Sequence, residues 1–221
     1  MQRFSCVRVK MKIVGVTYGN AKRLILKGDS ALLVNRKPFF IPDETQEAVA
    51  IPCIALRVSR LGKTISPRFA SRYYDAYAPA LDIQAADLRA RAIKEGVAWT
   101  EAVSLDGSLP LGSWKEGNVE NCLKMTIVQS PSSLRDNSPI VEELERHYGV
   151  TEEQIEAGIC LVSKYMTIRQ GDVIYLQLTG EEIELQQNDC LKMRVENISE
   201  VVEKEATENE VKEDGLFCRI K

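Results

Sequence analysis

Short runs of apolar, β-branched residues recur along the chain and predict a protein built mostly of strands. The clearest run lies at 49–58, where Val, Ile and Leu dominate until Gly62 interrupts the pattern. Other apolar runs predict strands at 12–16, 81–85, 123–129, 188–196 and 215–221, and within 30–43 and 169–178. The last two strands of the chain, 188–196 and 215–221, are expected to pair as a hairpin with a long tip.

Residue patterns typical of helices occur only in segments between these strands. Thr151 and Gln154 fit a capping box that starts a helix over 151–167, and acidic residues fill its first turn. Further helices are predicted at 66–78, where Pro67 follows a candidate N-cap, at 86–99, with Gly96 as its stop, and from Ser138 to Tyr148. Strands dominate and do not alternate regularly with helices, which favours an α+β, mostly β fold.

Composition and charge narrow the classes of partner. The 221 residues are 44% hydrophobic and 28% charged, with a formal net charge of −3. Because no basic stripe is visible, nucleic acid is not an expected partner. No apolar run reaches the roughly 18 residues of a membrane span, so no membrane is expected either. Basic residues throughout 1–10 argue against an export signal, which predicts a cytoplasmic protein.

The cysteines and the single histidine do not form a recognisable metal site. Six cysteines are widely spaced without a C-x-x-C pair, and in a cytoplasm they are expected to be reduced thiols. His147 lies in the polar stretch EELERHYG, which is predicted to be helical and exposed. A zinc site is therefore not expected.

Among the carboxylates, Asp82 stands apart. Asp75 and Asp87 fit solvent-facing or first-turn helix positions, and Asp106 lies in the turn sequence SLDGS. Asp82 instead lies between Leu81 and an isoleucine on a short apolar strand, so we expect it near or inside the core. A buried carboxylate needs hydrogen bonds or a cation.

Several segments together resemble the fumarylacetoacetate hydrolase superfamily. They are KPFFIP, VSRLGKTISPRFASRYYDAY, LDIQAADLRARAIKEGVAWTEAVSLDGSLPLG and KYMTIRQGDVIYLQL, which occur in family order. The resemblance implies a mixed β-sandwich roll, usually dimeric, in which Mg²⁺ or Mn²⁺ assists hydrolysis, decarboxylation or isomerisation of 2-oxo and β-diketo acids. It predicts an N-terminal extension at 1–10, a single domain at 11–221, and an acidic hairpin insertion at about 199–214.

The same resemblance shows where this sequence departs from the metal-dependent pattern. The family's metal is held by a Glu-x-Glu pair on the strand before SRLGK and by a third carboxylate. Those positions read Ile51, Cys53 and Asp82, so Asp82 is the only ligand position retained. An isoleucine and a lone thiol do not hold Mg²⁺. Val103 stands where the family has a substrate-orienting lysine.

Two further family elements also differ. The family's helical lid, which carries a His and a Glu, is missing from VTYGNAKRLILKGDSALL, where only Tyr18 matches clearly. The substrate turn Thr-Gly-Thr-Pro reads LTGEE around Thr179, without the proline. A vestigial pocket is therefore expected near Ile51, Cys53, Asp82, Val103 and Thr179.

These observations favour a family member that has lost its metal site, with no catalytic residues, no cofactor, and a structural, regulatory or ligand-binding role. The alternative is an active enzyme on a 2-oxo or β-diketo acid that uses Mg²⁺ or Mn²⁺ in a rebuilt site, with ligands from Asp82, Asp106 and Glu101. A homodimer is expected in either case. An unidentified protein partner is a third hypothesis, for which the acidic segment 199–214 is the candidate surface.

Overall fold

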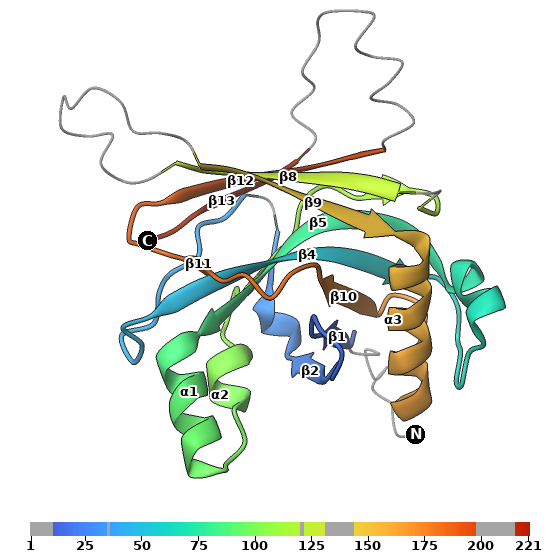
Figure 1. Ribbon diagram of the computed structural model, residues 1–221, viewed down its shortest axis with the longest axis horizontal. Coiled ribbons are helices and arrows are strands. Elements are labelled where there is room, and N and C mark those ends of the chain that lie inside the picture. Colours follow the sequence, from blue (N-terminus) through green and yellow to red (C-terminus); the bar gives the residue numbers. More distant parts are fainter. Residues whose placement is uncertain (1–10, 35, 120–121, 131–143, 198–214) are drawn as a thin grey trace, which may run out of the picture.

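Two β-sheets form the body of the protein (Figure 1). The computed structural model describes residues 11–34, 36–119, 122–130, 144–197 and 215–221. Within these residues the larger sheet has seven strands in the order β2-β1-β10-β4-β5-β7, with β11 paired to β4. The smaller sheet has four strands in the order β13-β12-β8-β9, and β3 pairs with β6 separately. The fold is α+β and mostly β, as predicted.

The element bounds are as follows. The strands are β1 (Ile13–Val16), β2 (Leu24–Lys27), β3 (Leu32–Leu33), β4 (Ala48–Val58), β5 (Tyr74–Ala85), β6 (Leu109–Pro110), β7 (Lys115–Glu116), β8 (Cys122–Ser130), β9 (Leu144–Thr151), β10 (Val173–Gln177), β11 (Ile183–Glu184), β12 (Cys190–Asn197) and β13 (Leu216–Arg219). The helices are α1 (Ala86–Glu95), α2 (Thr100–Val103) and α3 (Glu152–Tyr165), with 3₁₀ helices η1 (Asp29–Ala31) and η2 (Pro67–Tyr73).

The main core lies between the two sheets. Figure 1 shows the four-stranded sheet above β4 and β5. Alternate residues of β8 and β12, among them Met125 and Met193, meet Leu56 and Leu81 from the larger sheet in one buried cluster. This alternation is the period-two pattern of strands with one face on a core.

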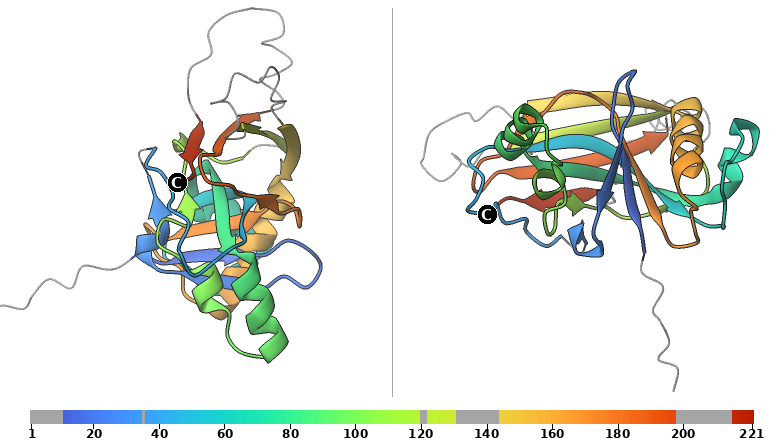
Figure 2. Two further views of the ribbon diagram at one scale, coloured as in Figure 1. Left: turned by 90° about the vertical axis from the view of Figure 1, so that its left-hand side faces the viewer. Right: turned by 90° about the horizontal axis from the view of Figure 1, so that it is seen from below.

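The larger sheet is covered on its other face as well. Figures 1 and 2 show β1 and β2 below β4 and β5, so the sheet is strongly curved. On the inner side of this curve a second cluster contains Cys53, Ala55, Ala80, Leu109 and Tyr175. Both faces of β4 are therefore buried, which explains why the predicted strand 49–58 is apolar along nearly its whole length.

Two of the predicted helices are confirmed. Helix α3 has the predicted capping box, because Thr151 accepts from the Gln154 backbone and Gln154 accepts from the Thr151 backbone. Helix α1 ends at Gly96, whose left-handed conformation has a φ of 69°. The C-terminal hairpin is also confirmed, since β12 and β13 pair antiparallel.

Two predicted helices are wrong. Segment 66–78 has only the short 3₁₀ helix η2, after which β5 begins at Tyr74 and pairs with β4 along its whole length. The described part of the segment ending at Tyr148 is strand β9, which pairs antiparallel with β8, and His147 is exposed on it. In both cases pairing with a long neighbouring strand outweighs the local helical spacing. The extension at 1–10 and the acidic insertion at 199–214 lie outside the described residues.

Candidate functional site

Asp82 lies at the centre of a polar cluster inside the larger sheet. It faces Ile51 across the β4–β5 ladder, and its side chain is fully buried. Cys53, two positions along β4, lies on the same face and is opposite Gln177 of β10. The structure therefore brings together the three positions that the family resemblance assigned to a metal centre.

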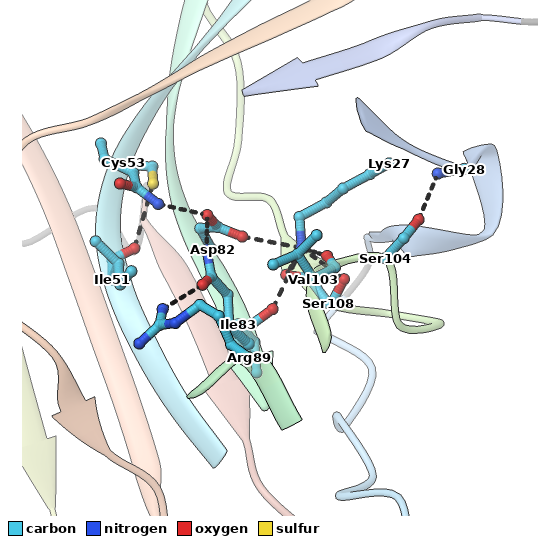
Figure 3. A network of polar contacts seen from close by, with 12 residues as sticks. Lys27, Gly28, Ile51, Cys53, Asp82, Ile83, Arg89, Val103, Ser104 and Ser108 are labelled. Atoms are coloured by element: carbon cyan, nitrogen blue, oxygen red, sulfur yellow. Dashed lines mark hydrogen bonds and ion pairs between the residues drawn. The ribbon is translucent and has the colours of Figure 1, made fainter. Parts of the chain in front are cut away.

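The counter-ion of Asp82 is Lys27, from β2. The Lys27 Nζ lies 2.9 Å from Asp82 Oδ1, and both side chains are 0% exposed. Four further oxygen acceptors surround this ammonium group: the Val103 carbonyl at 2.5 Å, the Ser108 hydroxyl at 2.8 Å, and the carbonyls of Ile83 and Ser108 at 3.2 and 3.3 Å (Figure 3). These acceptors saturate the three protons of the ammonium group.

Two glutamines donate hydrogen bonds to the second oxygen of the carboxylate. Gln84 Nε2 and Gln177 Nε2 each donate to Asp82 Oδ2 at 2.7 Å. Their own carbonyl oxygens are also satisfied, because Gln84 accepts from Arg89 and Gln177 accepts from the Tyr18 backbone N–H at 3.1 Å. Oδ2 of Asp82 is therefore committed to two protein donors, whereas Oδ1 has the Lys27 ammonium as its ion-pair partner and accepts no hydrogen bond from the described residues.

The neighbours of Asp82 on β4 offer no ligand for a hard metal ion. Ile51 is buried, and the Cys53 thiol donates to the Ile51 carbonyl at 3.2 Å. Burial, and secondarily the charge of Asp82, raises the pKa of Cys53 well above its ordinary value. A lone thiol is moreover a soft donor, which does not suit a hard ion such as Mg²⁺.

The remaining predicted site residues are Val103, Thr179, Asp106 and Glu101. Val103 ends α2, and its side chain is buried among apolar residues while its carbonyl contacts Lys27. Thr179 lies in the turn after β10, where its hydroxyl accepts from the Glu181 N–H at 3.0 Å. Asp106 bonds instead to the Ser30 hydroxyl at 2.5 Å, and Glu101 is exposed on α2. The structure does not bring Asp106 or Glu101 into the Asp82 cluster.

Sequence reasoning missed Lys27, Gln84 and Gln177. A signal for Lys27 exists in LILK, where strand alternation puts it on the same face as the buried Ile25. Gln84 carried the same kind of signal, because it lies two positions after Asp82 on one strand and so shares its face, whereas Gln177 carried none. Gln84 and Gln177 follow Asp82 and Leu176 on apolar strands, but only the sheet register shows that both amides reach one carboxylate.

A cleft of about 420 Å³ opens beside this cluster. It lies between the loop after β1, the first turns of α3 and the end of β10, and is lined by Tyr18, Asn20, Lys22, Gln154 and Gln177 among others. Gln177 thus connects the cleft with Asp82.

Among the described residues, no helix has both the length and the apolar character needed to cross a membrane.

The sequence pattern of the fumarylacetoacetate (FAA) hydrolase C-terminal family matches residues 9–204. The chain belongs to the fumarylacetoacetate hydrolase family. This confirms the resemblance that the scaffold motifs indicated.

Individual family relatives agree with this assignment. The mitochondrial oxaloacetate tautomerase FAHD1 of Arabidopsis thaliana is 29% identical over 160 residues, which span 71% of this chain and 66% of that protein. The protein of the same name from Bos taurus is 28% identical over 71% of this chain and 67% of its own length. The structure of fumarylpyruvate hydrolase from Pseudomonas aeruginosa, in complex with Mn²⁺ and pyruvate, aligns with a TM-score of 0.74 at 13% identity, covering 96% of this chain and 89% of that one. At that identity the structural likeness supports the shared fold.

The side chains around Asp82 do not fit the divalent ion that the family implies. Within the described residues, no group of three or more His, Cys, Asp or Glu side chains is placed to hold a metal. Asp82 Oδ2 already accepts from two amides, the charge of the carboxylate is balanced by Lys27, and Ile51 and Cys53 supply neither charge nor a hard oxygen donor. Among positions 51, 53 and 82, only Asp82 carries a carboxylate.

Proposed function

We propose that this family member functions without a divalent metal ion and without turnover, as a structural, regulatory or ligand-binding protein. The observation that carries the proposal is the fully buried ion pair between Lys27 and Asp82, beside the apolar side chains of Ile51 and Cys53.

Charge balance explains why this pair argues against a metal. One buried ammonium and one buried carboxylate are neutral together, so a divalent ion placed there adds two charges with no compensating groups. Uncompensated charge in a protein interior is strongly unfavourable. The two glutamates that the family pattern expects at 51 and 53 would supply that compensation. Their replacement by apolar residues is consistent with simultaneous loss of the ligands and the ion.

The second candidate is an active enzyme on a 2-oxo or β-diketo acid with a rebuilt metal site. Two matching relatives are named oxaloacetate tautomerases, and a cleft lies beside Gln177, which contacts Asp82. This candidate requires Asp106 and Glu101 to leave their present surroundings and join Asp82.

Calorimetric titration with Mg²⁺ and Mn²⁺, with and without oxalate as an enolate mimic, distinguishes the candidates. We expect no binding heat from this protein. The Pseudomonas aeruginosa fumarylpyruvate hydrolase, whose crystal contains Mn²⁺, serves as the positive control. In parallel, the conversion of enol-oxaloacetate to the keto form is followed by ultraviolet absorbance. Micromolar metal affinity or metal-dependent conversion would overturn the proposal in favour of the enzyme.

The homodimer and the cytoplasmic location stay predictions. Sedimentation equilibrium of the purified full chain tests the dimer, since a single monomer mass at micromolar concentration contradicts it. Fractionation of cells that produce the full chain tests the location, since recovery in an organelle or membrane fraction contradicts a cytoplasmic protein.

A further inference from the structure

Two adjoining hollows open at the edge of the four-stranded sheet, where β13 is the terminal strand. One, of about 440 Å³, lies between β13 and the chain around Val34 and Trp114. The other, of about 400 Å³, lies over β12 and β13. Arg36, Gly215 and Phe217 line both. Hollows of this size are typical of small-molecule sites, and these share no residue with the Asp82 cluster.

Strand alternation explains why aromatic and cationic side chains lie together here. Leu216 and Cys218 of β13 are buried in the core, so Phe217 between them faces outward. Lys192 is exposed and lies directly opposite Phe217 in the β12–β13 ladder. Arg194 follows two positions along β12 and is exposed on the same face. Two cations therefore lie beside one aromatic ring on the outer face of the sheet.

The opposite wall carries a second aromatic ring, that of Trp114. This side chain packs against the inner cluster of the larger sheet, and the Arg57 guanidinium lies 5.8 Å from its ring centroid. A glycine lets the wall approach β13 closely, because a Cβ at Gly112 would lie 3.0 Å from the Leu216 backbone nitrogen. Trp114 is therefore held in place by the protein, so a ligand that packs against it has little ordering cost to overcome.

Arg36, which lines both hollows, has an unusual backbone conformation. Its φ is 56°, in the left-handed region that glycine adopts readily and residues with a Cβ adopt seldom. Strain of this kind clusters at binding sites, where a particular side chain is needed. The conformation therefore supports a role for the Arg36 guanidinium in the hollows that it lines.

The two hollows are cationic and contain no compensating carboxylate. Their linings include Arg36, Lys192 and Arg194 and no Asp or Glu, although the chain as a whole has a formal net charge of −3. The hollow at the first residues of β5 differs, because it has Asp75 beside its arginines. An anion in the two hollows at β13 therefore meets cations without a competing acidic side chain in the lining.

We propose that the two hollows form one binding site for a small amphiphilic anion, a molecule with a flat aromatic ring and an acidic group. The ring packs against Phe217 and Trp114, and the acidic group pairs with the cations of the lining. This inference goes beyond the proposed function, because it involves no residue of the Asp82 cluster and holds whether or not that cluster binds a metal.

The test is a fluorescence titration of the purified full chain with the aromatic anion anilinonaphthalene sulfonate, at physiological ionic strength. Saturable binding of this dye is expected. Naphthoate, which combines a ring with a charge, is expected to displace the dye. Naphthylmethanol has the same ring without the charge, and acetate has the charge without the ring. Each is expected to displace the dye at least about tenfold less effectively than naphthoate.

Three variants locate the site. Lys192→Glu and Arg194→Glu reverse exposed charges on β12, and each is expected to weaken dye affinity about fivefold or more. Arg36→Gly removes the guanidinium at a position whose backbone suits glycine, so it is expected to fold normally and still lose about threefold or more in affinity. The matched control is Lys94→Glu, an exposed cation of α1 that lines neither hollow and is expected to leave the affinity unchanged.

Unchanged dye affinity in the three variants, or an equal loss in Lys94→Glu, would overturn the proposal. Equal displacement by naphthoate and naphthylmethanol, or the absence of saturable dye binding, would overturn it as well. Thermal unfolding of each variant, monitored by circular dichroism, separates a loss of affinity from a loss of folding. The titration is made in EDTA, so its outcome does not depend on whether the proposed function is correct.

Discussion

Two ion-pair clusters occupy opposite ends of the same pair of strands and differ in their access to water. At one end Lys27 meets Asp82 with both side chains fully buried. At the other end Arg57 of β4 contacts Asp75 of β5 at 2.7 Å and Glu116 of β7 at 2.6 Å, with side-chain exposures from 33% to 70%. The chemistry of the contacts is alike, so their energetic difference comes from the surroundings.

Burial, rather than the number of ion pairs, determines how much stability is lost when one partner of a pair is removed. Water screens the Arg57 cluster, and either partner is solvated when the other is removed. At Asp82 a missing partner leaves a charge in the interior with only amide donors. The predictions below test this difference, beginning with the largest expected effect.

Replacing Lys27 by methionine is expected to lower the free energy of unfolding by about 3–5 kcal/mol, because Asp82 becomes an uncompensated buried charge. Urea denaturation monitored by circular dichroism measures the loss. The double variant Lys27→Met/Asp82→Leu is the control and should recover much of the stability, since both charges are gone. A Lys27→Met protein as stable as the original would contradict the claim that removing one partner of a buried ion pair is costly.

Gln177→Leu is expected to cost about 1–3 kcal/mol, because Asp82 Oδ2 loses one donor and the Tyr18 N–H loses its acceptor. The same denaturation assay measures it. Gln154, which faces the same cleft but belongs to the α3 capping box, is a suitable comparison: Gln154→Leu should cost less, because that amide lies at an exposed helix end. The reverse order would show that Asp82 does not depend on its glutamines.

Asp87 gives a pH-dependent test at the start of α1. Burial raises the pKa of Asp87, but donation from the Gln46 N–H, the Thr45 hydroxyl and the Leu88 N–H outweighs it, and the pKa falls below its ordinary value. The resulting stability is fully present above the unfolded pKa of about 3.9 and is lost as pH falls through the folded pKa. As the pH falls, the free energy of unfolding should therefore decrease less steeply for Asp87→Asn than for the unchanged protein. If both proteins lose stability identically as the pH falls, Asp87 does not contribute to the pH dependence of stability.

The smallest effect is expected at the exposed cluster. Arg57→Gln should change stability by no more than about 1 kcal/mol, and the change should diminish further in 1 M salt. Thermal unfolding at low and high salt measures both quantities. A loss comparable to that of Lys27→Met would show that exposure does not separate the two clusters.

The scaffold was predictable from the sequence where local and tertiary preferences agree. Helix α3 carries its own capping box, and 49–58 is apolar enough to predict a buried strand without knowledge of its neighbours. The segment beginning at Tyr74 was not predictable in this way, because its helical spacing conflicts with the strand that β4 imposes on it. Local propensity differs by too little to withstand a complete ladder of hydrogen bonds.

For the candidate site, the sequence by itself determined the chemistry of the individual positions: Ile51 and Cys53 cannot replace two carboxylates, and Asp82 must find a buried partner. Only the tertiary structure decided that the partner is Lys27 and that Gln84 and Gln177 complete the carboxylate's contacts. Gln177 lies 95 positions from Asp82 along the chain. Contacts over such separations depend on which strands are neighbours and in what register, and side-chain identity alone specifies neither.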